Sequence, residues 1–381
     1  MKHFICLLML TLTILALIAL SCSPVRFGRL PQGERKERVM RSPNYRNGRF
    51  QNLPVAPQLA APLPDTTSTA SREQKPRSKL AMMWRWLFER PDSIRPAEPI
   101  PTKPFDLLSL DPNEDVLVWF GHSSYFLQLG GRRVLVDPVF SKSGAPVSFV
   151  NKAFEGTRIC SAADMPPIDY LIITHDHWDH LDYPTVKALR PKVRKVLCPL
   201  GVGEHFERWE FDPSRIVELD WHDVVQPDSD VVLVCLPAHH FSGRSFVRNP
   251  SLWASFLLQI AGLKIFIGGD SGYAPYFADI GQTYGPIDLA MIENGQYNLS
   301  WPDIHMMPDE TLQAGRDLQA RVVMPVHNSK FALSIHRWDE PLNRVTALHS
   351  GTDFNLITPM IGEQISLREC GSYVSKTWWK N

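Results

Sequence analysis

Short apolar runs recur from about residue 115 onward, and this pattern predicts an α/β domain. The runs are rich in β-branched residues and are separated by Gly, Pro, Asp and Asn, which favours strands. We expect strands at about 116–120, 124–129, 132–136, 169–174, 194–198, 231–236, 254–260, 263–267, 288–292 and 321–325. Amphipathic segments predict helices near 183–190, 201–209 and 309–319.

Metal-ligand side chains gather directly after one of these apolar runs. The predicted strand at 169–173 continues into Thr-His-Asp-His-Trp-Asp-His at 174–180. In an extended chain His175 and His177 point to the same side, so both imidazoles can reach one cation. Asp179 and His180 follow at the turn, where they can serve a second cation. Imidazole and carboxylate suit zinc, and they also accept iron or manganese.

Three later apolar runs also end at residues that can bind a metal. The run at 231–236 leads to His239 and His240, the run at 263–267 to Asp270, and the run at 321–326 to His327. When each strand is followed by a ligand, the strand ends are expected to converge on one edge of a sheet. The alternative, a solvated turn with incidental histidines, does not explain the repetition.

Five sequence blocks in this order resemble the metallo-β-lactamase superfamily, over roughly residues 115–365. Besides the motif at 174–180 they are GHSSYFLQLGGRRVLVDPVFS (121–141), LPAHHFSGR (236–244), GGDSGY (268–273) and DIHMMPDET (303–311). Within the superfamily they look most like the phospholipase D group that hydrolyses N-acyl-phosphatidylethanolamine, with sugar-phosphate lactonases more distant. The resemblance implies an α/β fold of the four-layer αββα type.

The resemblance also implies a site for two Zn²⁺ ions, with Fe or Mn as alternatives. His175, His177 and His240 would hold the first ion, Asp179, His180 and His327 the second, and Asp270 would bridge both. His305 would contact the phosphate or the leaving group from outside the metal shell, and His239 would pack behind His240. Asp137 would orient a ligating histidine, while His122 is either a site residue or a buried histidine satisfied by the backbone. The remaining histidines, including His205, His222, His336 and His349, are expected at the surface or at caps.

The implied reaction is phosphodiester hydrolysis by metal-bound hydroxide, with Asp179 both ligating a metal and accepting a proton. Three functions compete. The first is a membrane-anchored phospholipase D acting on N-acyl-phosphatidylethanolamine-like lipids. The second is a hydrolase of a soluble ester, lactone or cyclic phosphate, and the third is a binding protein that retains the fold. The complete ligand set argues against the third function.

The N-terminus predicts a location in the bacterial cell envelope. A basic start and an apolar stretch from Phe4 to Leu20 precede Cys22, as in a lipoprotein signal peptide over 1–21 with lipid on Cys22. An uncleaved transmembrane helix is the alternative. Ser23 after the cysteine favours the outer membrane. Residues 22–80 are predicted to be a partly disordered tether. Residues 81–381 are predicted to be the hydrolase domain, whose Trp-rich start at 81–88 either caps the fold, the interpretation that we favour, or lies on the membrane interface.

The composition excludes one class of partner. The chain has 40 basic and 40 acidic residues, so nothing suggests a nucleic-acid partner. Beyond the signal, Cys160, Cys198, Cys235 and Cys370 stand singly and are expected to be free thiols, with a disulfide as the alternative. A homodimer, as in the phospholipase group, is a further expectation that the sequence leaves open.

Overall fold

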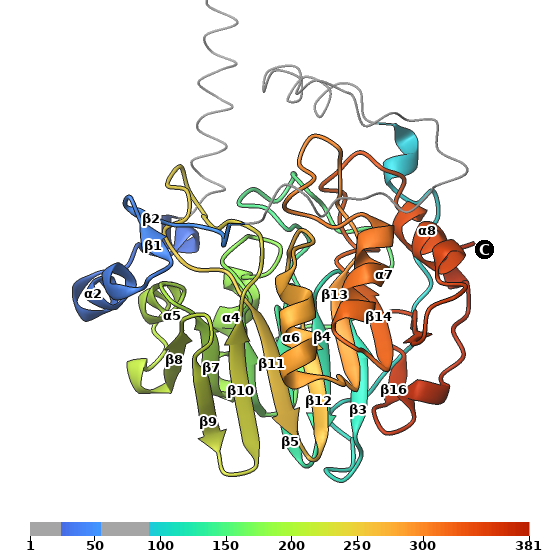
Figure 1. Cartoon of the computed structure of the whole chain (residues 1–381), viewed down its shortest axis with the longest axis horizontal. Coiled ribbons are helices and arrows are strands. Elements are labelled where there is room, and N and C mark those ends of the chain that lie inside the picture. The colour runs from blue at the N-terminus through green and yellow to red at the C-terminus, as the bar shows by residue number, and fades with distance from the viewer. Residues whose placement is uncertain (1–23, 55–90, 381) are drawn as a thin grey trace, which may run out of the picture.

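Two mixed β-sheets form the centre of the computed structural model, which describes residues 24–54 and 91–380 (Figure 1). The first sheet runs in the order β16 (Gln364–Ser366), β3 (Val116–Trp119), β4 (Tyr125–Leu129), β5 (Arg132–Val136), β6 (Ile168–Ile172), β7 (Val193–Pro199) and β8 (Ile216–Leu219). The second runs in the order β15 (Asn355–Leu356), β14 (Val322–Val326), β13 (Leu289–Glu293), β12 (Leu263–Ile267), β11 (Ser255–Ile260), β10 (Val231–Leu236) and β9 (Val224–Asp228). Every predicted strand is present, and β8, β9, β15 and β16 are additional.

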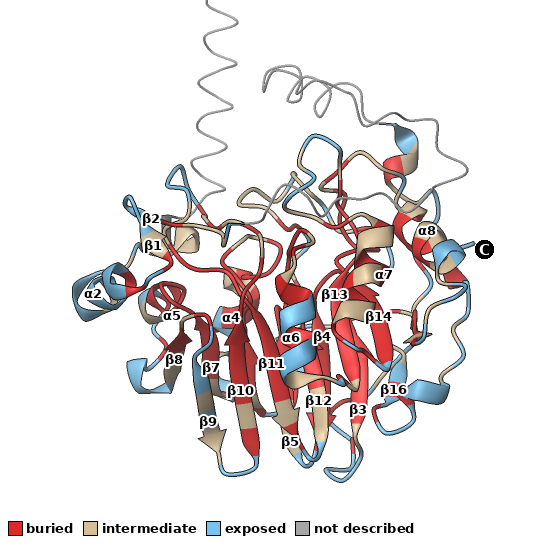
Figure 2. Cartoon of the chain, viewed as in Figure 1, coloured by how far each residue is buried: buried red, intermediate tan, exposed pale blue. Residues whose placement is uncertain are grey.

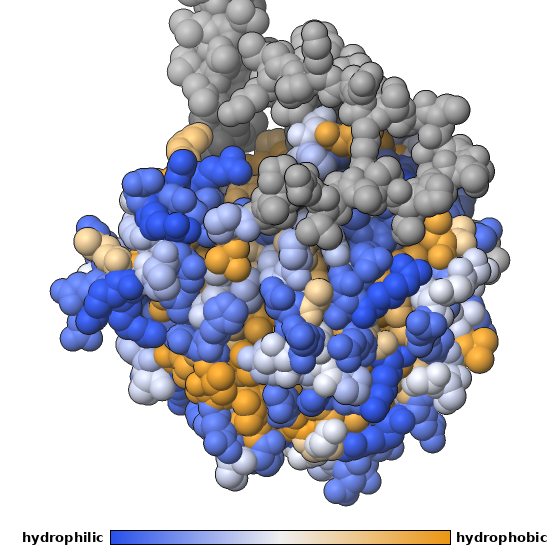
Figure 3. Space-filling view, in the orientation of Figure 1, coloured by the Kyte–Doolittle hydropathy of each residue, from blue (hydrophilic) through white to orange (hydrophobic). Residues whose placement is uncertain are grey.

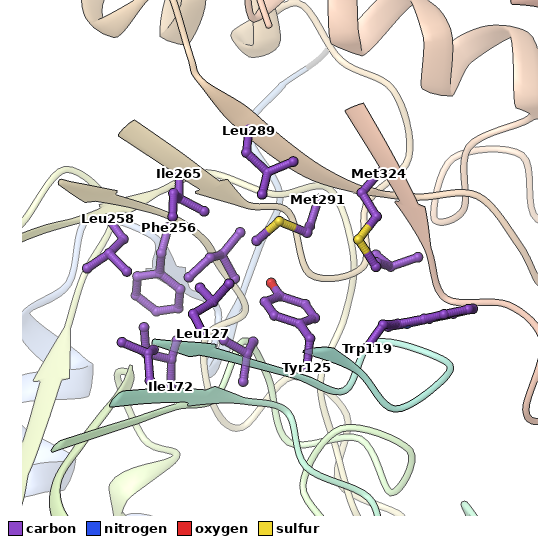
Figure 4. Close-up of a cluster of buried hydrophobic side chains, with 14 of the residues drawn as sticks. Trp119, Tyr125, Leu127, Ile172, Phe256, Leu258, Ile265, Leu289, Met291 and Met324 are labelled. Atoms are coloured by element: carbon purple, nitrogen blue, oxygen red, sulfur yellow. The ribbon is translucent and has the colours of Figure 1, made fainter. Parts of the chain in front are cut away.

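The core lies between the two sheets because each strand alternates its side chains. In β6, Tyr170 and Ile172 belong to the inter-sheet cluster, whereas Leu171 packs on the outer face. Figure 4 shows side chains of both sheets meeting in this cluster, with Leu127 of β4 and Phe256 of β11 among them. Burial of both faces explains why the central strands read as nearly continuous apolar runs (Figure 2).

Helices cover the outer faces of both sheets and complete the four-layer αββα sandwich. The helices α4 (Tyr183–Leu189) and α5 (Gly203–Arg208) contribute buried side chains to the cluster outside the first sheet. The helices α6 (Tyr276–Tyr284), α7 (Pro308–Asp317) and α8 (Glu340–Leu348) contribute to the cluster outside the second. The predicted fold class and the three predicted helices are confirmed, whereas α6 and α8 were not expected.

Residues 24–54 are folded, and the tether predicted for 22–80 is wrong for this part of it. They form a short 3-10 turn (Pro24–Phe27), α2 (Gly33–Arg41), β1 (Tyr45–Arg46) and β2 (Arg49–Phe50). Val39 and Phe50 are buried in the inter-sheet cluster. The polar composition of this segment suggested disorder, but its basic side chains pair with acidic partners on the domain. The Arg35 guanidinium, for example, lies 2.6 Å from a Glu218 carboxylate oxygen.

Several predictions fall outside the described residues. They are the signal peptide at 1–21, the lipidated Cys22, the rest of the tether at 55–80 and the Trp-rich segment at 81–88. Within the described ranges, none of the helices has the length and apolar character needed to cross a bilayer. The face drawn in Figure 3 is mostly hydrophilic, with apolar patches interrupting it. Cys160, Cys198, Cys235 and Cys370 are free thiols, as expected.

Candidate metal centre

The seven predicted ligands meet at one edge of the sandwich, where several strands end. The loop after β6 carries His175, His177, Asp179 and His180. His240 follows β10, Asp270 follows β12 and His327 follows β14, and these strands run toward the upper edge in Figure 1. The predicted convergence of strand ends is therefore confirmed.

His175, His177, His240 and Asp270 form the first ligand group, with one ligand atom from each lying within 4.8 Å of the others. The Nδ1 of His177 is 2.9 Å from Nε2 of His175 and 3.2 Å from Nε2 of His240. Asp270 Oδ2 lies 3.8 Å from His175 Nε2 and 3.7 Å from His240 Nε2. Three imidazoles and one carboxylate oxygen thus face a common point.

His122, Asp179, His180 and His327 form the second ligand group, which meets the same 4.8 Å limit. The other oxygen of Asp270, Oδ1, is 3.1 Å from His180 Nε2 and 3.0 Å from His327 Nδ1. Asp270 therefore offers one oxygen to each group, as the predicted bridging position requires. His122 joins this group through Asp179, since its Nε2 lies 2.8 Å from Asp179 Oδ2.

Unsatisfied buried atoms show that the site suits divalent cations. His180 Nε2, Asp270 Oδ1 and His327 Nε2 are buried and, despite the short distances between His180, His327 and Asp270, make no well-directed hydrogen bond among the described residues. Leaving such atoms without a partner is costly, and a cation is the partner that imidazole nitrogens and a carboxylate oxygen share. The donor set contains no thiolate, so it accepts zinc, iron or manganese.

The protonation states agree with this interpretation. Burial holds the pKa values of His175 and His240 well below the usual histidine range. Burial also lowers the pKa of His327 to about 3, so these three imidazoles are neutral near pH 7 and their lone pairs can bind a metal. Burial alone would raise the pKa of Asp270, but the positive charge of His180, whose own pKa is raised, and short polar contacts with the His180 and His327 rings outweigh it and hold the pKa of this carboxyl well below its usual range.

Hydrogen bonds from behind fix the orientation of the histidines. Asp137 Oδ2 lies 2.8 Å from His180 Nδ1 and accepts a 2.6 Å hydrogen bond from the Thr174 hydroxyl. The predicted orienting contact of Asp137 is thus confirmed. The Ile304 carbonyl oxygen lies 3.0 Å from His240 Nδ1, which leaves Nε2 of that ring directed at the ligand group.

The backbone at the site adopts conformations that L residues rarely use. His122, Asp137 and His327 have φ values of 55°, 40° and 65°. Gly269, directly before Asp270, has φ +61°, and a Cβ there would lie 2.8 Å from Cβ of Thr174. Strained residues of this kind persist only where the surrounding structure holds them, and here they place ligand-bearing loops close together.

His305 lies beside the ligands, paired with a carboxylate that the sequence analysis missed. Its Nδ1 is 3.0 Å from Glu293 Oε2, and its ring stacks on His327 at a centroid distance of 5.1 Å. Burial raises the pKa of Glu293 to about 7, while the charge of Glu293 more than offsets the effect of burial on His305 and raises its pKa. Glu293 is the last residue of β13 and has no histidine beside it in the sequence, so no local motif marked it as a site residue.

The other histidines divide in a way the sequence did not settle. His122 is a site residue, and His239 lies outside both ligand groups, where its backbone N–H donates to the Ser271 hydroxyl. His205, expected at the surface, is instead buried, with Nε2 3.3 Å from Asp176 Oδ2. Asp176 also accepts hydrogen bonds from the Gly243 N–H and the Ser251 hydroxyl, which ties the motif loop to its neighbours.

The fold and the site together define a metal-dependent hydrolase of the metallo-β-lactamase type. The family model of the β-lactamase superfamily domain matches residues 132–328, about half of the chain. The chain therefore belongs to this superfamily.

Relatives extend the similarity beyond the matched domain. An uncharacterized protein of Mycobacterium tuberculosis is 37% identical over 343 residues, which cover 89% of this chain and 88% of that protein. The mitochondrial N-acyl-phosphatidylethanolamine-hydrolyzing phospholipase D of Saccharomyces cerevisiae is 32% identical over 244 residues, 60% of this chain and 51% of that enzyme. The outer membrane protein RomA of Klebsiella pneumoniae is 52% identical over 120 residues, 31% of this chain and 89% of that protein.

A solved structure supports the fold and leaves the metal open. CmlA, a diiron β-hydroxylase from Streptomyces venezuelae, has a TM-score of 0.52 at 20% identity, covering 67% of this chain and 55% of that one. At this identity the similarity concerns the fold alone.

Proposed function

We propose that this protein is a dinuclear metal-dependent phosphodiesterase of the phospholipase D type, acting on N-acyl-phosphatidylethanolamine or a similar phospholipid. The observation that carries the proposal is Asp270, whose two oxygens face two separate groups of buried histidines. The similarity to the yeast phospholipase over 244 residues supports the choice of a phosphodiester.

The side chains around the ligands suit this reaction. Two divalent cations held by the two ligand groups would lower the pKa of a bound water and polarise the phosphoryl oxygen. Asp179, held by His122 at 2.8 Å, accepts the proton of the attacking water. His305 is fixed through Nδ1 by Glu293, so Nε2 is the ring nitrogen that can donate to the phosphate or to the departing alcohol. Water attacks phosphorus, the bond to the head-group oxygen breaks, and phosphatidic acid and an N-acylethanolamine result.

The decisive experiment measures both products from liposomes that contain N-acyl-phosphatidylethanolamine. We expect N-acylethanolamine and phosphatidic acid in equal amounts, loss of both after chelation, and recovery when Zn²⁺, Fe²⁺ or Mn²⁺ is restored. Activity that survives complete removal of metal would refute the mechanism. Hydrolysis of soluble esters, lactones or cyclic phosphates without any lipid product would replace the substrate assignment and keep the metal centre.

We also propose that the mature protein is anchored by lipid on Cys22 and lies in the outer membrane. The N-terminal sequence supports the anchor, and the similarity to the Klebsiella outer membrane protein over 120 residues supports the location. Metabolic labelling with a palmitate analogue is expected to mark the wild type and to leave Cys22→Ser unlabelled. Equal labelling of both would exclude this anchor.

A further inference from the structure

The folded N-terminal segment at 24–54 reaches the metal centre through Asn52. The Asn52 side-chain amide hydrogen-bonds to both the carbonyl oxygen and the N–H of His240. Its Nδ2 donates to the His240 carbonyl oxygen at 2.9 Å. Its Oδ1 accepts from the His240 N–H at 3.1 Å. One side chain therefore satisfies both peptide groups of a predicted ligand, as a neighbouring strand would.

Asn52 is itself held in place. Its Oδ1 also accepts a 2.9 Å hydrogen bond from the indole N–H of Trp253, a side chain that is almost fully buried. Two further hydrogen bonds join the segment to the loop after His240. The Phe50 N–H donates to the Asn249 carbonyl oxygen, and the Asn249 side chain donates to the Phe50 carbonyl oxygen. The amide is thus positioned before any metal binds.

The beginning of the same segment contacts the loop that carries the other ligands. The Phe27 ring packs edge-on against Trp178, in the middle of the 174–180 motif, at a centroid distance of 5.1 Å. Arg244 also contacts this tryptophan: its guanidinium lies 3.9 Å from the centre of the Trp178 ring and donates to the Arg26 carbonyl oxygen at 2.9 Å. Arg244 also donates to the Asp176 carbonyl oxygen at 2.9 Å.

We propose that residues 24–54 complete the metal centre, and that Asn52 is a positioning residue for His240. The His240 ring has one fixed point at Nδ1, where it contacts the Ile304 carbonyl. Among the described residues, its peptide is fixed a second time through Asn52 alone, with the buried Trp253 behind it. Without the amide, the His240 peptide loses both partners and the imidazole must be ordered by the incoming cation, which weakens binding. The proposal rests on His240 being a metal ligand, as the proposed function requires.

The test is metal affinity, measured with the full-length chain by competition against a chromophoric Zn²⁺ chelator. For Asn52→Ala we expect about a 10-fold weaker affinity at one of two sites, the range found when contacts behind a ligating histidine are removed. The Co²⁺-loaded variant is expected to show a changed d–d absorption spectrum, which a purely structural role would leave unaltered.

Asn44→Ala is the matched control. Asn44 lies in the same segment and donates to Asp220 Oδ1 at 2.8 Å, and it belongs to neither ligand group. Asn44→Ala is expected to match the wild type in affinity within about twofold, although it too loses a hydrogen bond between the segment and the domain. Equal affinities and equal Co²⁺ spectra for Asn52→Ala and the control would overturn the proposal.

Two further variants distinguish the positioning role of Asn52 from misfolding and from an incorrect ligand assignment. Asn52→Asp retains the acceptor for His240 N–H and Trp253, replaces the donor with a carboxylate oxygen and adds a negative charge, so an intermediate affinity is expected even if the alanine variant folds poorly. Wild-type affinity in the folded Asn52→Asp variant would count against the role of the donor and overturn the two-sided clamp. His240→Ala separates this proposal from the proposed function, because unchanged Zn²⁺ binding there would refute the ligand itself rather than its positioning.

Discussion

The motif loop at 174–180 and the N-terminal segment at 24–54 build the same site by opposite means. The loop places four candidate metal ligands directly after the strand that supports them, so its proposed role is visible in seven consecutive residues. The segment meets its partners far along the chain: Asn52 and His240 are 188 residues apart, and Arg35 and Glu218 are 183 apart. Chemistry concentrated in a motif can thus depend on a polar segment that shows no motif.

The largest loss of activity is expected when one of the predicted metal ligands is replaced. Asp270→Asn retains the shape of the side chain and removes the charge that both ligand groups share. We expect turnover of bis(p-nitrophenyl) phosphate to fall by on the order of a thousand-fold, because about 4 kcal/mol of transition-state stabilisation would be lost. Bound metal, measured by elemental analysis, should fall as well.

Asp230→Asn is the control for this substitution, since Asp230 is an exposed aspartate paired with Arg132 away from the ligands. Its metal content and turnover should equal those of the wild type. An Asp270→Asn protein that holds two metals as tightly as the wild type would show that this carboxylate does not bridge them.

A smaller effect is expected at Glu293, which ends a strand like the ligands but contacts His305. Glu293→Gln should lower turnover by roughly 10- to 100-fold without reducing bound metal, because an amide cannot accept from His305, Ser271 and Met306 together. Steady-state kinetics and elemental analysis on the same preparation check both parts. Glu363→Gln, another carboxylate that accepts from a backbone N–H, should leave turnover unchanged. Loss of metal in Glu293→Gln would instead make Glu293 part of the metal shell.

The smallest effect is expected in the N-terminal segment, at a contact far from the metal centre. Arg35→Ala removes a guanidinium 2.6 Å from Glu218, a carboxylate whose side chain is only 1% exposed. We expect a loss of about 2 kcal/mol in the free energy of unfolding by urea, less than for a fully buried pair because Gly201 and Gly203 also donate to Glu218. Zn²⁺ affinity should stay within about twofold of the wild type, since Asn52 keeps its contacts.

Arg38→Ala provides the comparison, because Arg38 Nη1 lies 4.0 Å from the Glu218 carboxylate, Nη2 donates only to the Glu218 backbone carbonyl oxygen at 3.0 Å, and the side chain is 48% exposed. Its cost should be below about 1 kcal/mol. Equal unfolding free energies for the Arg35→Ala and Arg38→Ala variants would mean that the buried pair does not hold the segment to the domain.

The central strands and the meeting of the candidate metal ligands could be predicted from the sequence because their signals are local. Burial on both faces makes β10 and β12 apolar throughout, and each ligand directly follows its strand. The strands β8 and β9 were missed because they lie at the ends of their sheets, where one side lacks a partner strand and polar residues are tolerated. In β9 the residue Pro227 further weakened the pattern.

The missed parts of the site depend on distant partners. Nothing near Glu293 in the sequence indicates His305, since a loop separates them. In α2, Val39 is the only buried residue, so its pattern resembles that of a solvated segment. The helix is stabilised by ion pairs with Glu204, Glu207 and Glu218, which only the folded chain brings close. Composition could not distinguish this arrangement from disorder.

The place where the folded body begins has a consequence for how far the enzyme can reach. Only Ser23 separates Cys22 from Pro24, the first residue of the turn whose Phe27 packs on Trp178. A residue spans at most about 3.6 Å, so acyl chains on Cys22 would begin within roughly 7 Å of the body. Such an anchor would hold the folded body close to the bilayer. If Cys22 carries the proposed lipid, the metal centre would stay near the bilayer surface, within reach of substrates that diffuse in the membrane.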